Sequence, residues 1–294
     1  MNHYLISVII PVYNDQHGLD ECLRALGNQS LPYQHFEVVV VDNASQPEIK
    51  LPKLANLNCI LETCEKPGSY AARNVGVRIA SGEVIAFLDA DCLPEKDWLE
   101  QGLAVVQSAP LKTLVGGEVK LTTSEKPTAV ELYQCLTGFG QQYNIEQQNF
   151  SATANLFVRQ EQALLIGKFN ENLLSGGDRE WSWRAKAHGF DIKFSRSTLV
   201  ATVPRKSLGA AIKQARRIAG GRYHFKKLSA ADSHGDITGL APRRGTWEAT
   251  WWLLTHAELS LIDRSRVFSV AITLKLVQMI ETFRLEKGAS PERC

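Results

Sequence analysis

The sequence lacks the cysteine patterns that mark a zinc site or a disulfide framework. Its six cysteines include no C-x-x-C pair and do not cluster with histidine. We therefore expect reduced, partly buried thiols rather than cross-links or metal ligands. The six are Cys22, Cys59, Cys64, Cys92, Cys135 and Cys294.

Excess charge and targeting signals are also lacking. The net charge at pH 7 is +2, which gives no reason to expect a nucleic-acid partner. Residues 1–3 lead directly into a strand pattern without a signal peptide. We therefore expect a cytoplasmic protein, and peripheral contact with the inner face of the cytoplasmic membrane stays open. The sequence has no internal repeat and no low-complexity tract.

The composition is that of a chain with a large core. Of its 294 residues, 44% are hydrophobic and 22% are charged, as in ordinary soluble globular proteins. The length suits one large domain with an appendage. We expect an α/β domain over residues 1–204 and a basic, amphipathic helical region over residues 205–294.

The most informative stretch runs from Glu83 to Pro94 and reads E-V-I-A-F-L-D-A-D-C-L-P. Its first part is an almost wholly apolar run, which predicts a strand buried on both faces. Asp89 and Asp91 follow directly, at the strand end where open α/β sheets bind ligands. Carboxylate oxygens suit Mg²⁺ or Mn²⁺, and these ions are commonly shared with substrate phosphates. The alternative is that Asp91 or a neighbour caps a helix that starts near residues 94–97.

Strand and helix patterns alternate along the first half of the chain. Short apolar runs predict strands at residues 5–12, 36–41, 58–61, 84–88, 113–119 and 151–158. Helical spacing predicts helices between them, including one over residues 70–80 with Ser69 as its N-cap and one that starts at Asp178. This order predicts an α/β fold in which a mainly parallel, Rossmann-like sheet is flanked by helices.

Polar side chains stand at the predicted strand ends, and Arg73 lies early in the helix over residues 70–80. Because the carboxyl ends of parallel strands meet at one edge of a sheet, we expect the strand-end residues to converge. These residues are Pro11, Tyr13, Asp42, Asp89 and Asp91. Simpler roles stay open: Asp42 can form a turn, Arg73 can be a helix-surface charge, and Asp178 can be only an N-cap.

Taken together, five segments resemble the family 2 glycosyltransferases with the GT-A fold. The resemblance covers about residues 4–205, and the segments fall in the family's order and approximate spacing. They are S-V-I-I-P-V-Y-N at 7–14, V-V-V-V-D-N-A-S at 38–45, A-A-R-N-V-G at 71–76, D-A-D at 89–91 and G-D-R-E-W-S-W-R at 177–184.

The resemblance implies a nucleotide site. Pro11 and Tyr13 would line the base and ribose, and Asp42 would accept a hydrogen bond from the base. Arg73 would help to hold the nucleotide, and Asp89 would lie near the ribose and the metal shell. A UDP-sugar is the favoured donor. Basic residues that close over the diphosphate are sought among Arg216, Arg217, Arg222 and His224.

The resemblance also implies a metal ligand and a base. Asp91 would bind Mn²⁺ or Mg²⁺ together with Asp89, and Asp178 matches the family's general base. The usual pair there is Glu-Asp, whereas this chain has Gly177 before Asp178. The departure leaves the base in place but puts its surroundings and the acceptor contacts in doubt.

The implied activity is an inverting transfer of one sugar to a hydroxyl group. The acceptor would be a glycan or a lipid-linked molecule in exopolysaccharide or cell-envelope synthesis. Since no clean Q-x-x-R-W motif of processive synthases is present, we expect a single transfer rather than polymerisation. Two alternatives stay open: an inactive sugar-nucleotide-binding scaffold, and a nucleotidyltransferase.

The C-terminal part of the chain is basic and amphipathic. Residues 192–231 include ten Lys or Arg and no Asp or Glu, which indicates either a solvated basic helix or a positive face for phosphates or anionic lipid. Residues 247–287 predict two helices, the second over 264–287 with a wide apolar stripe. Lys275 interrupts this stripe, which is too short to span a bilayer. It can pack on the core, form a homodimer, or lie on a membrane surface.

Overall fold

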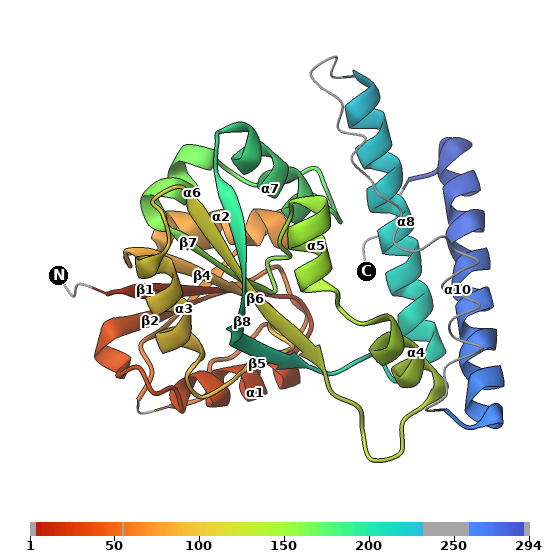
Figure 1. The fold of residues 1–294 in the computed structure, drawn as a ribbon, viewed down its shortest axis with the longest axis horizontal. Coiled ribbons are helices and arrows are strands. Elements are labelled where there is room, and N and C mark those ends of the chain that lie inside the picture. Colours follow the sequence, from red (N-terminus) through yellow and green to blue (C-terminus); the bar gives the residue numbers. More distant parts are fainter. Residues whose placement is uncertain (1–3, 55, 232–258, 291–294) are drawn as a thin grey trace. The chain divides into compact units, whose positions relative to one another are not determined.

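The structure is a computed structural model that describes residues 4–54, 56–231 and 259–290. It divides into two compact units, and each unit combines segments that are far apart in the sequence (Figure 1). Unit 1 comprises Met1–Lys120, Gly140–Asn172 and Gly177–Thr202. Unit 2 comprises Leu121–Phe139, Leu173–Gly176 and Val203–Cys294.

Unit 1 contains a mixed eight-stranded sheet with the order β3-β2-β1-β4-β7-β6-β8-β5. Its strands are β1 (Ile6–Val12), β2 (Phe36–Asp42), β3 (Cys59–Thr63), β4 (Val84–Leu88), β5 (Cys92–Pro94), β6 (Thr113–Leu121), β7 (Asn155–Arg159) and β8 (Asp191–Thr202). The pairs β3/β2, β2/β1 and β1/β4 are parallel, whereas β4/β7, β7/β6 and β5/β8 are antiparallel. The α/β class is thus confirmed. Parallel pairing joins β1, β2, β3 and β4, and three of these strands, β1, β2 and β4, carry the predicted strand-end residues.

Strands β5 and β8 were not predicted from the sequence. β5 is only three residues long and pairs with β8, which lies far along the chain. β8 occupies the start of the basic stretch, so the interpretation of residues 192–231 as one basic helix is wrong for this part. Lys193 and Arg196 are exposed on β8, while Ser195 and Thr198 are buried. Buried and exposed residues thus alternate in part along β8, but the buried ones include polar Ser and Thr, so the hydropathy of the sequence does not show the alternation.

Helices cover both faces of the sheet. They are α1 (Gln16–Gly27), α2 (Ser69–Ile79), α3 (Trp98–Ser108), α5 (Gln141–Gln148), α6 (Gln160–Ile166) and α7 (Gly177–Ala187), with a 3₁₀ turn at Tyr33–His35. Directly paired strand residues point to the same face, and Ile9 and Phe87 are such a pair. A Cβ on Gly76 of α2 would lie 2.4 Å from Ile9, and the ring of Phe87 lies 6.3 Å from that of Trp181 in α7. Helices α2 and α7 therefore share one face of the sheet.

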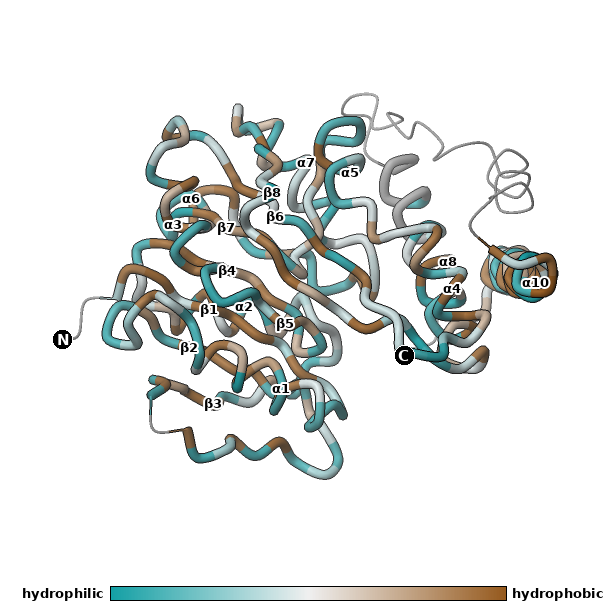
Figure 2. Tube along the Cα trace, turned by 60° about the horizontal axis from the view of Figure 1, so that its bottom comes forward, coloured by the Kyte–Doolittle hydropathy of each residue, from teal (hydrophilic) through white to brown (hydrophobic). Residues whose placement is uncertain are grey.

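The opposite face of the sheet carries Phe157, which follows the partner of Phe87 along β7. Its ring centroid lies 4.9 Å from that of Trp98, the first residue of α3. Figure 2 shows the apolar character of β1, β4 and β7 in the middle of unit 1. The buried core is therefore built between this sheet and its two helical layers.

Unit 2 is helical and includes α4 (Ala129–Thr137), α8 (Leu208–Ala231) and α10 (Leu261–Glu286). Its buried cluster consists of Val130, Ala211, Ala215, Val270 and Leu274. The predicted second helix of the tail is confirmed as α10, whereas the predicted helix that starts at Trp247 lies largely outside the described residues. Among the described helices, none combines the length and apolar character needed to cross a bilayer.

Candidate active site

The carboxyl ends of β1, β2 and β4 lie side by side in unit 1. Strand β1 is hydrogen-bonded to β2 on one side and to β4 on the other, all in parallel. Val12 at the end of β1 is paired with Asp42 at the end of β2. Asp89 follows β4 directly. The local apolar runs that form these strands thus bring polar side chains to one sheet edge.

Asp42 holds the loop that follows β2. Its carboxylate is only 4% exposed, and its two oxygens accept hydrogen bonds from the amides of Ser45 (3.0 Å) and Ile49 (3.3 Å). The hydroxyl of Ser45 in turn accepts one from the amide of Asn14 (2.8 Å), which ties the loops after β1 and β2 together. The turn-forming role is therefore present, and recognition of a base by Asp42 remains a prediction.

Pro11 and Tyr13 differ in accessibility. Pro11 is a buried residue inside β1, which continues to Val12, so proline does not mark the end of the strand. Tyr13 is 40% exposed. Of the two residues predicted to line the nucleotide, Tyr13 is the one with an exposed side chain.

Arg73 joins the sheet edge to α2. Its side chain is 4% exposed, and Nη2 donates a hydrogen bond to Oδ1 of Asp89 over 2.5 Å. The guanidinium also lies over the ring of Tyr70, 5.6 Å from its centroid. The alternative of a helix-surface charge is therefore wrong. Its Nε is buried without a hydrogen-bond partner among the described residues, which is rare in folded proteins and calls for a functional explanation.

The start of α2 differs from the sequence expectation. Gly68, with φ 120°, is the residue before the helix and makes no side-chain capping bond, and Ser69 is the first helical residue. The prediction of Ser69 as N-cap is therefore wrong. The amide of Gly68 donates instead to the side chain of Asn43 from the loop after β2 (2.7 Å). This bond fixes the start of α2 next to the sheet edge.

Asp178 lies in the first turn of α7, one residue after its start at Gly177. It is therefore not the N-cap. Its Oδ1 accepts hydrogen bonds from the amide of Arg179 (2.9 Å) and from the phenol of Tyr70 (3.4 Å). Helices α2 and α7 share one face of the sheet, which brings Tyr70 of α2 to Asp178 of α7. Arg73, which lies over the ring of Tyr70, bonds to Asp89. The two α2 residues thus connect Asp178 with Asp89.

Groups around Asp178 shift the pKa of its carboxyl group in opposite directions. Desolvation by burial raises the pKa of its carboxyl group above the ordinary value, and the charge of Asp89 adds to this. The charge of Arg73 and the amide of Arg179 lower the pKa and limit the rise. Burial likewise raises the pKa of Tyr70, so its phenol is protonated at neutral pH and is the hydrogen-bond donor of the pair. A carboxylate with a raised pKa is better matched to accept a proton near neutral pH.

Gly177, the residue before Asp178, also lies against the ring of Tyr70. A Cβ at this position would lie 2.6 Å from Cε2 of Tyr70, closer than side-chain atoms pack. The ring of Tyr70 is itself stacked on Phe169, with centroids 5.9 Å apart. The ring of Tyr70 therefore fills the space in which a glutamate side chain at position 177 would begin.

Asp89 and Asp91 are the candidate metal ligands. Asp91 is exposed and is followed by β5, while α3 begins at Trp98 with Asp97 before it. The alternative of a helix cap at Asp91 is therefore wrong. Within residues 4–54, 56–231 and 259–290, no three or more His, Cys, Asp or Glu side chains form a metal-binding group. Two carboxylates fit Mg²⁺ or Mn²⁺ when phosphate oxygens and water complete the shell, as is usual for these ions at nucleotide sites.

Tyr70 was missed by the sequence interpretation. It stands three residues before Arg73, and side chains at this spacing lie on the same face of a helix. The spacing was therefore a usable signal once Arg73 was chosen. Its partner Asp178 lies more than a hundred positions away, and the interaction depends on the packing of α2 and α7.

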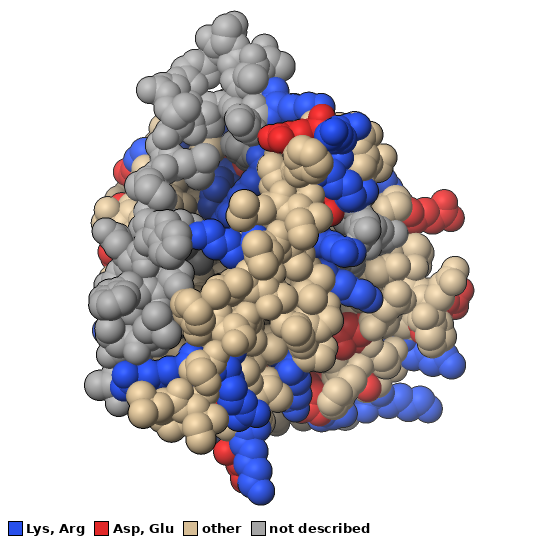
Figure 3. Space-filling model, turned by 90° about the vertical axis from the view of Figure 1, so that its right-hand side faces the viewer, with Lys and Arg blue, Asp and Glu red and all other residues tan. Residues whose placement is uncertain are grey.

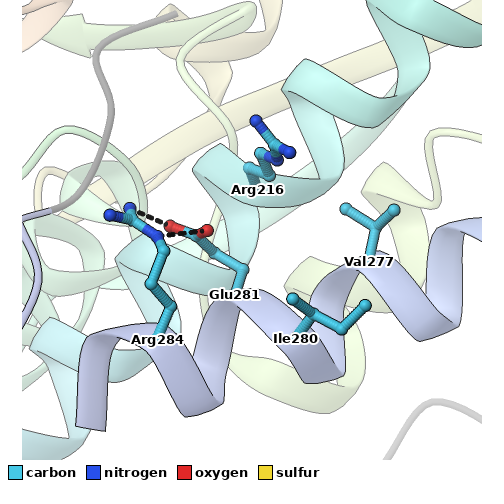
Figure 4. A pocket seen from close by; sticks show the side chains of 5 residues that line it. All are labelled: Arg216, Val277, Ile280, Glu281 and Arg284. Carbon is cyan, nitrogen blue, oxygen red and sulfur yellow. Dashed lines mark hydrogen bonds and ion pairs between the residues drawn. The ribbon is translucent and has the colours of Figure 1, made fainter. Parts of the chain in front are cut away.

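A hollow of about 130 Å³ lies in unit 2 between α8 and α10 (Figure 4). Its lining residues are Arg216, Val277, Ile280, Glu281 and Arg284. It is smaller than typical small-molecule pockets of roughly 300–1,000 Å³, and it contains none of the predicted site residues except Arg216. It is therefore not a candidate for the nucleotide site.

Comparison with known proteins assigns the family. The family described as "Glycosyl transferase family 2" matches residues 7–147. The glycosyltransferase AglE of Haloferax volcanii is 38% identical over 229 residues, which are 76% of this chain and 74% of AglE. The chain belongs to glycosyl transferase family 2. It is therefore a glycosyltransferase, and the resemblance seen in the sequence is confirmed.

Solved structures place this family 2 member among GT-A folds. The mannosyltransferase PcManGT from Pyrobaculum calidifontis, in complex with GDP-Man and Mn²⁺, has a TM-score of 0.62 at 18% identity and covers 98% of this chain and 88% of its own. TarS 1–349 of S. aureus in complex with UDP-GlcNAc has a TM-score of 0.51 at 19% identity and covers 96% and 90%. The chain spans 55% of a longer TarS structure. At these identities the likeness concerns the fold.

Proposed function

We propose that this glycosyltransferase moves one sugar from a nucleoside diphosphate sugar to an acceptor hydroxyl group, with inversion at the anomeric carbon. The observation that carries the proposal is the chain of contacts from Asp89 through Arg73 and Tyr70 to Asp178. It links a carboxylate suited to a metal with a carboxylate suited to proton transfer. The two groups differ in surroundings, as their two roles require.

Asp178 is the proposed general base. Its raised pKa brings it closer to the pH at which it works, and the amide of Arg179 and the phenol of Tyr70 orient its Oδ1. The acceptor hydroxyl attacks the anomeric carbon from the face opposite the diphosphate. As the new C–O bond forms, its proton passes to the free oxygen of Asp178, and the C–O bond to the diphosphate breaks. One displacement of this kind inverts the anomeric configuration.

Asp89 and Asp91 are the proposed holders of Mn²⁺ or Mg²⁺, with Arg73 fixing Asp89. A bound ion would neutralise charge on the departing diphosphate as a Lewis acid. PcManGT, a solved protein of similar fold, contains Mn²⁺ together with GDP-Man. Tyr13 is the proposed contact for the base or ribose because it is exposed beside this edge.

A UDP-sugar is the proposed donor, and a glycan or lipid-linked molecule of the cell envelope is the proposed acceptor. TarS was solved with UDP-GlcNAc and PcManGT with GDP-Man, so uridine and guanosine donors must be compared. The test is to incubate the full chain with UDP-, GDP- and dTDP-sugars, Mn²⁺ and an acceptor pool, and to measure release of free nucleoside diphosphate. We expect release that depends on the acceptor. Binding without turnover would instead favour an inactive scaffold.

A further inference from the structure

The outward side of α10 carries a row of exposed apolar side chains. The row consists of Ile272 (41% exposed), Leu276 (52%), Met279 (61%) and Phe283 (61%). These four residues lie within about 60° of one another around the helix axis, whereas Ile280, which is also exposed, lines the hollow beside α8. We call these four residues the outer row. Contiguous exposed apolar surface of this kind commonly marks an interaction site.

The outer row lies outside the buried cluster of unit 2. The opposite side of α10 supplies the buried residues Val267, Val270, Leu274 and Leu285. Val270 and Leu274 belong to the cluster formed with Ala211 and Ala215 of α8. Helix α10 therefore has one apolar side that is packed against its unit and a second apolar side that is exposed.

Positive charge borders the outer row. At a helical spacing of 3.6 residues per turn, Lys275 and Arg264 fall on one flank, and Arg266 and Arg284 on the other. Figure 3 shows an uncharged ridge with Lys and Arg side chains on both sides of it and with Asp and Glu near its upper and lower ends. Apolar side chains flanked by basic ones are typical of helices that lie in the plane of a membrane surface.

The acidic residues of α10 offset the charge on only one flank, where Asp263 pairs with Arg266 over 3.5 Å and Glu281 pairs with Arg284. Glu281 is 3% exposed, and its two oxygens accept hydrogen bonds from Nε and Nη2 of Arg284 (2.9 and 2.7 Å). The carboxylate thus faces the hollow between α8 and α10, with Arg216 on the neighbouring helix (Figure 4). Asp263 is engaged by the hydroxyl of Ser260 at the helix start (2.7 Å). Only Glu286, in the last turn, is an exposed acid of this helix.

Neighbouring α8 adds charge of the same sign. It contains six Lys or Arg and no Asp or Glu, and Lys213, Arg216, Arg222 and Lys227 are exposed. Helices α8 and α10 pack against each other within unit 2. Because α8 packs against the buried side of α10, a surface that accepts the outer row meets Lys275 and Arg264 first and the charge of α8 behind them.

We propose that the outer row of α10 docks unit 2 on an anionic lipid bilayer, with the helix lying in the plane of the interface. Negative lipid headgroups would complement the flanking Lys and Arg, whose long side chains reach headgroup level while the outer row enters the acyl region. A second copy of the chain fits less well, because a two-fold interface on this row would bring equal positive flanks together. The inference is independent of the proposed activity.

The test is flotation of the full chain with vesicles of neutral phosphatidylcholine and of a 4:1 mixture with phosphatidylglycerol. We expect binding to the anionic vesicles, weaker binding to the neutral ones, and a decrease as NaCl is raised from 50 to 500 mM. The double variant Leu276→Glu/Met279→Glu should lower partitioning about tenfold or more. Phe283→Glu alone should lower it in the same direction. All three positions are exposed, so the fold and the melting temperature should be retained.

The matched controls are Leu111→Glu and Leu164→Glu in unit 1, which change leucines that are more exposed than Leu276 and Met279 (71% and 63%) and should leave vesicle binding unaltered. Absence of binding to anionic vesicles would overturn the proposal, as would equal binding to neutral vesicles or an unaffected double variant. Light scattering tests the alternative in which a second copy of the chain covers the outer row. A dimer that becomes a monomer in Leu276→Glu/Met279→Glu, without vesicle binding by the wild type, would assign the outer row to a second copy.

Discussion

The ring of Tyr70 occupies the space in which a side chain at position 177 would begin. Its Cε2 lies 2.6 Å from the place of a Cβ on Gly177, while its hydroxyl donates to Oδ1 of Asp178 over 3.4 Å. One residue of α2 thus excludes a side chain before the proposed base and contacts the base itself. We therefore expect the effects of substitutions at Tyr70 and Gly177 on stability to depend on each other.

The first prediction concerns this pair. Gly177→Ala should destabilise the protein by about 1–3 kcal/mol, because overpacking forces neighbours to shift and the ring of Tyr70 is backed by Phe169. In a Tyr70→Ala background the same change should cost less, since the obstructing ring is gone. The difference, about 0.5–3 kcal/mol for residues in contact, is measured by urea unfolding of the four proteins of the cycle. Equal costs in both backgrounds would show that the ring is not the obstacle.

The second prediction concerns pH. Asp178 must be ionised to accept a proton, so kcat/KM should rise with pH through its raised pKa. The phenol of Tyr70 donates to the carboxylate and thereby favours its ionised form. Tyr70→Phe removes this donor and should shift the acidic limb of the profile to higher pH. A merely structural role would lower the rate without moving the limb, so the profile separates the two.

The parts of the fold with strong local signals were predictable. The run over residues 84–88 forms β4 with those bounds. Strands β1 and β2 likewise form from largely apolar runs. Each of these strands is buried along its whole length, so its sequence needs no alternation and is legible by itself. The predicted meeting of the strand ends depended only on parallel pairing, which the registers of β1 with β2 and β4 provide.

The parts that depend on distant partners were not predictable. β5 exists because three residues after Asp91 pair with β8, and no local pattern marks so short a strand. The contact of Tyr70 with Asp178 requires α2 and α7 to cover the same side of Phe87. Asn74, the residue after Arg73, is bound to the backbone of Phe169 by two hydrogen bonds and to the side chain of Glu171 by a third. Its role is therefore structural.

The third prediction tests the base. Asp178→Asn keeps the shape and removes the proton acceptor, so turnover should fall by about 10²–10⁴, the usual contribution of a general base. Affinity for the nucleotide should change little, because the variant carboxamide can still accept from the amide of Arg179. Released nucleoside diphosphate and calorimetric binding are the two measurements.

The control for this variant is Asp191→Asn, an equally conservative change at an exposed carboxylate (76%) that pairs with Lys186 on the surface of unit 1. It should retain full turnover. If Asp178→Asn were as active as Asp191→Asn, the proton would have to leave by another route, and Asp178 would no longer be the base.

The last prediction tests the metal ligands. Asp91→Asn weakens a hard anionic ligand, so affinity for UDP in the presence of Mn²⁺ should fall about tenfold or more, the scale found when metal sites lose a supporting group. In EDTA the wild type and the variant should bind alike, because the difference acts only through the ion. Asp97→Asn is the matched control, since this exposed aspartate lies beyond β5 at the start of α3 and asparagine serves that position equally well. Calorimetry with and without Mn²⁺ separates the possibilities: a loss that persists in EDTA would mean that Asp91 contacts the nucleotide directly, and an unchanged affinity would remove it from the metal site.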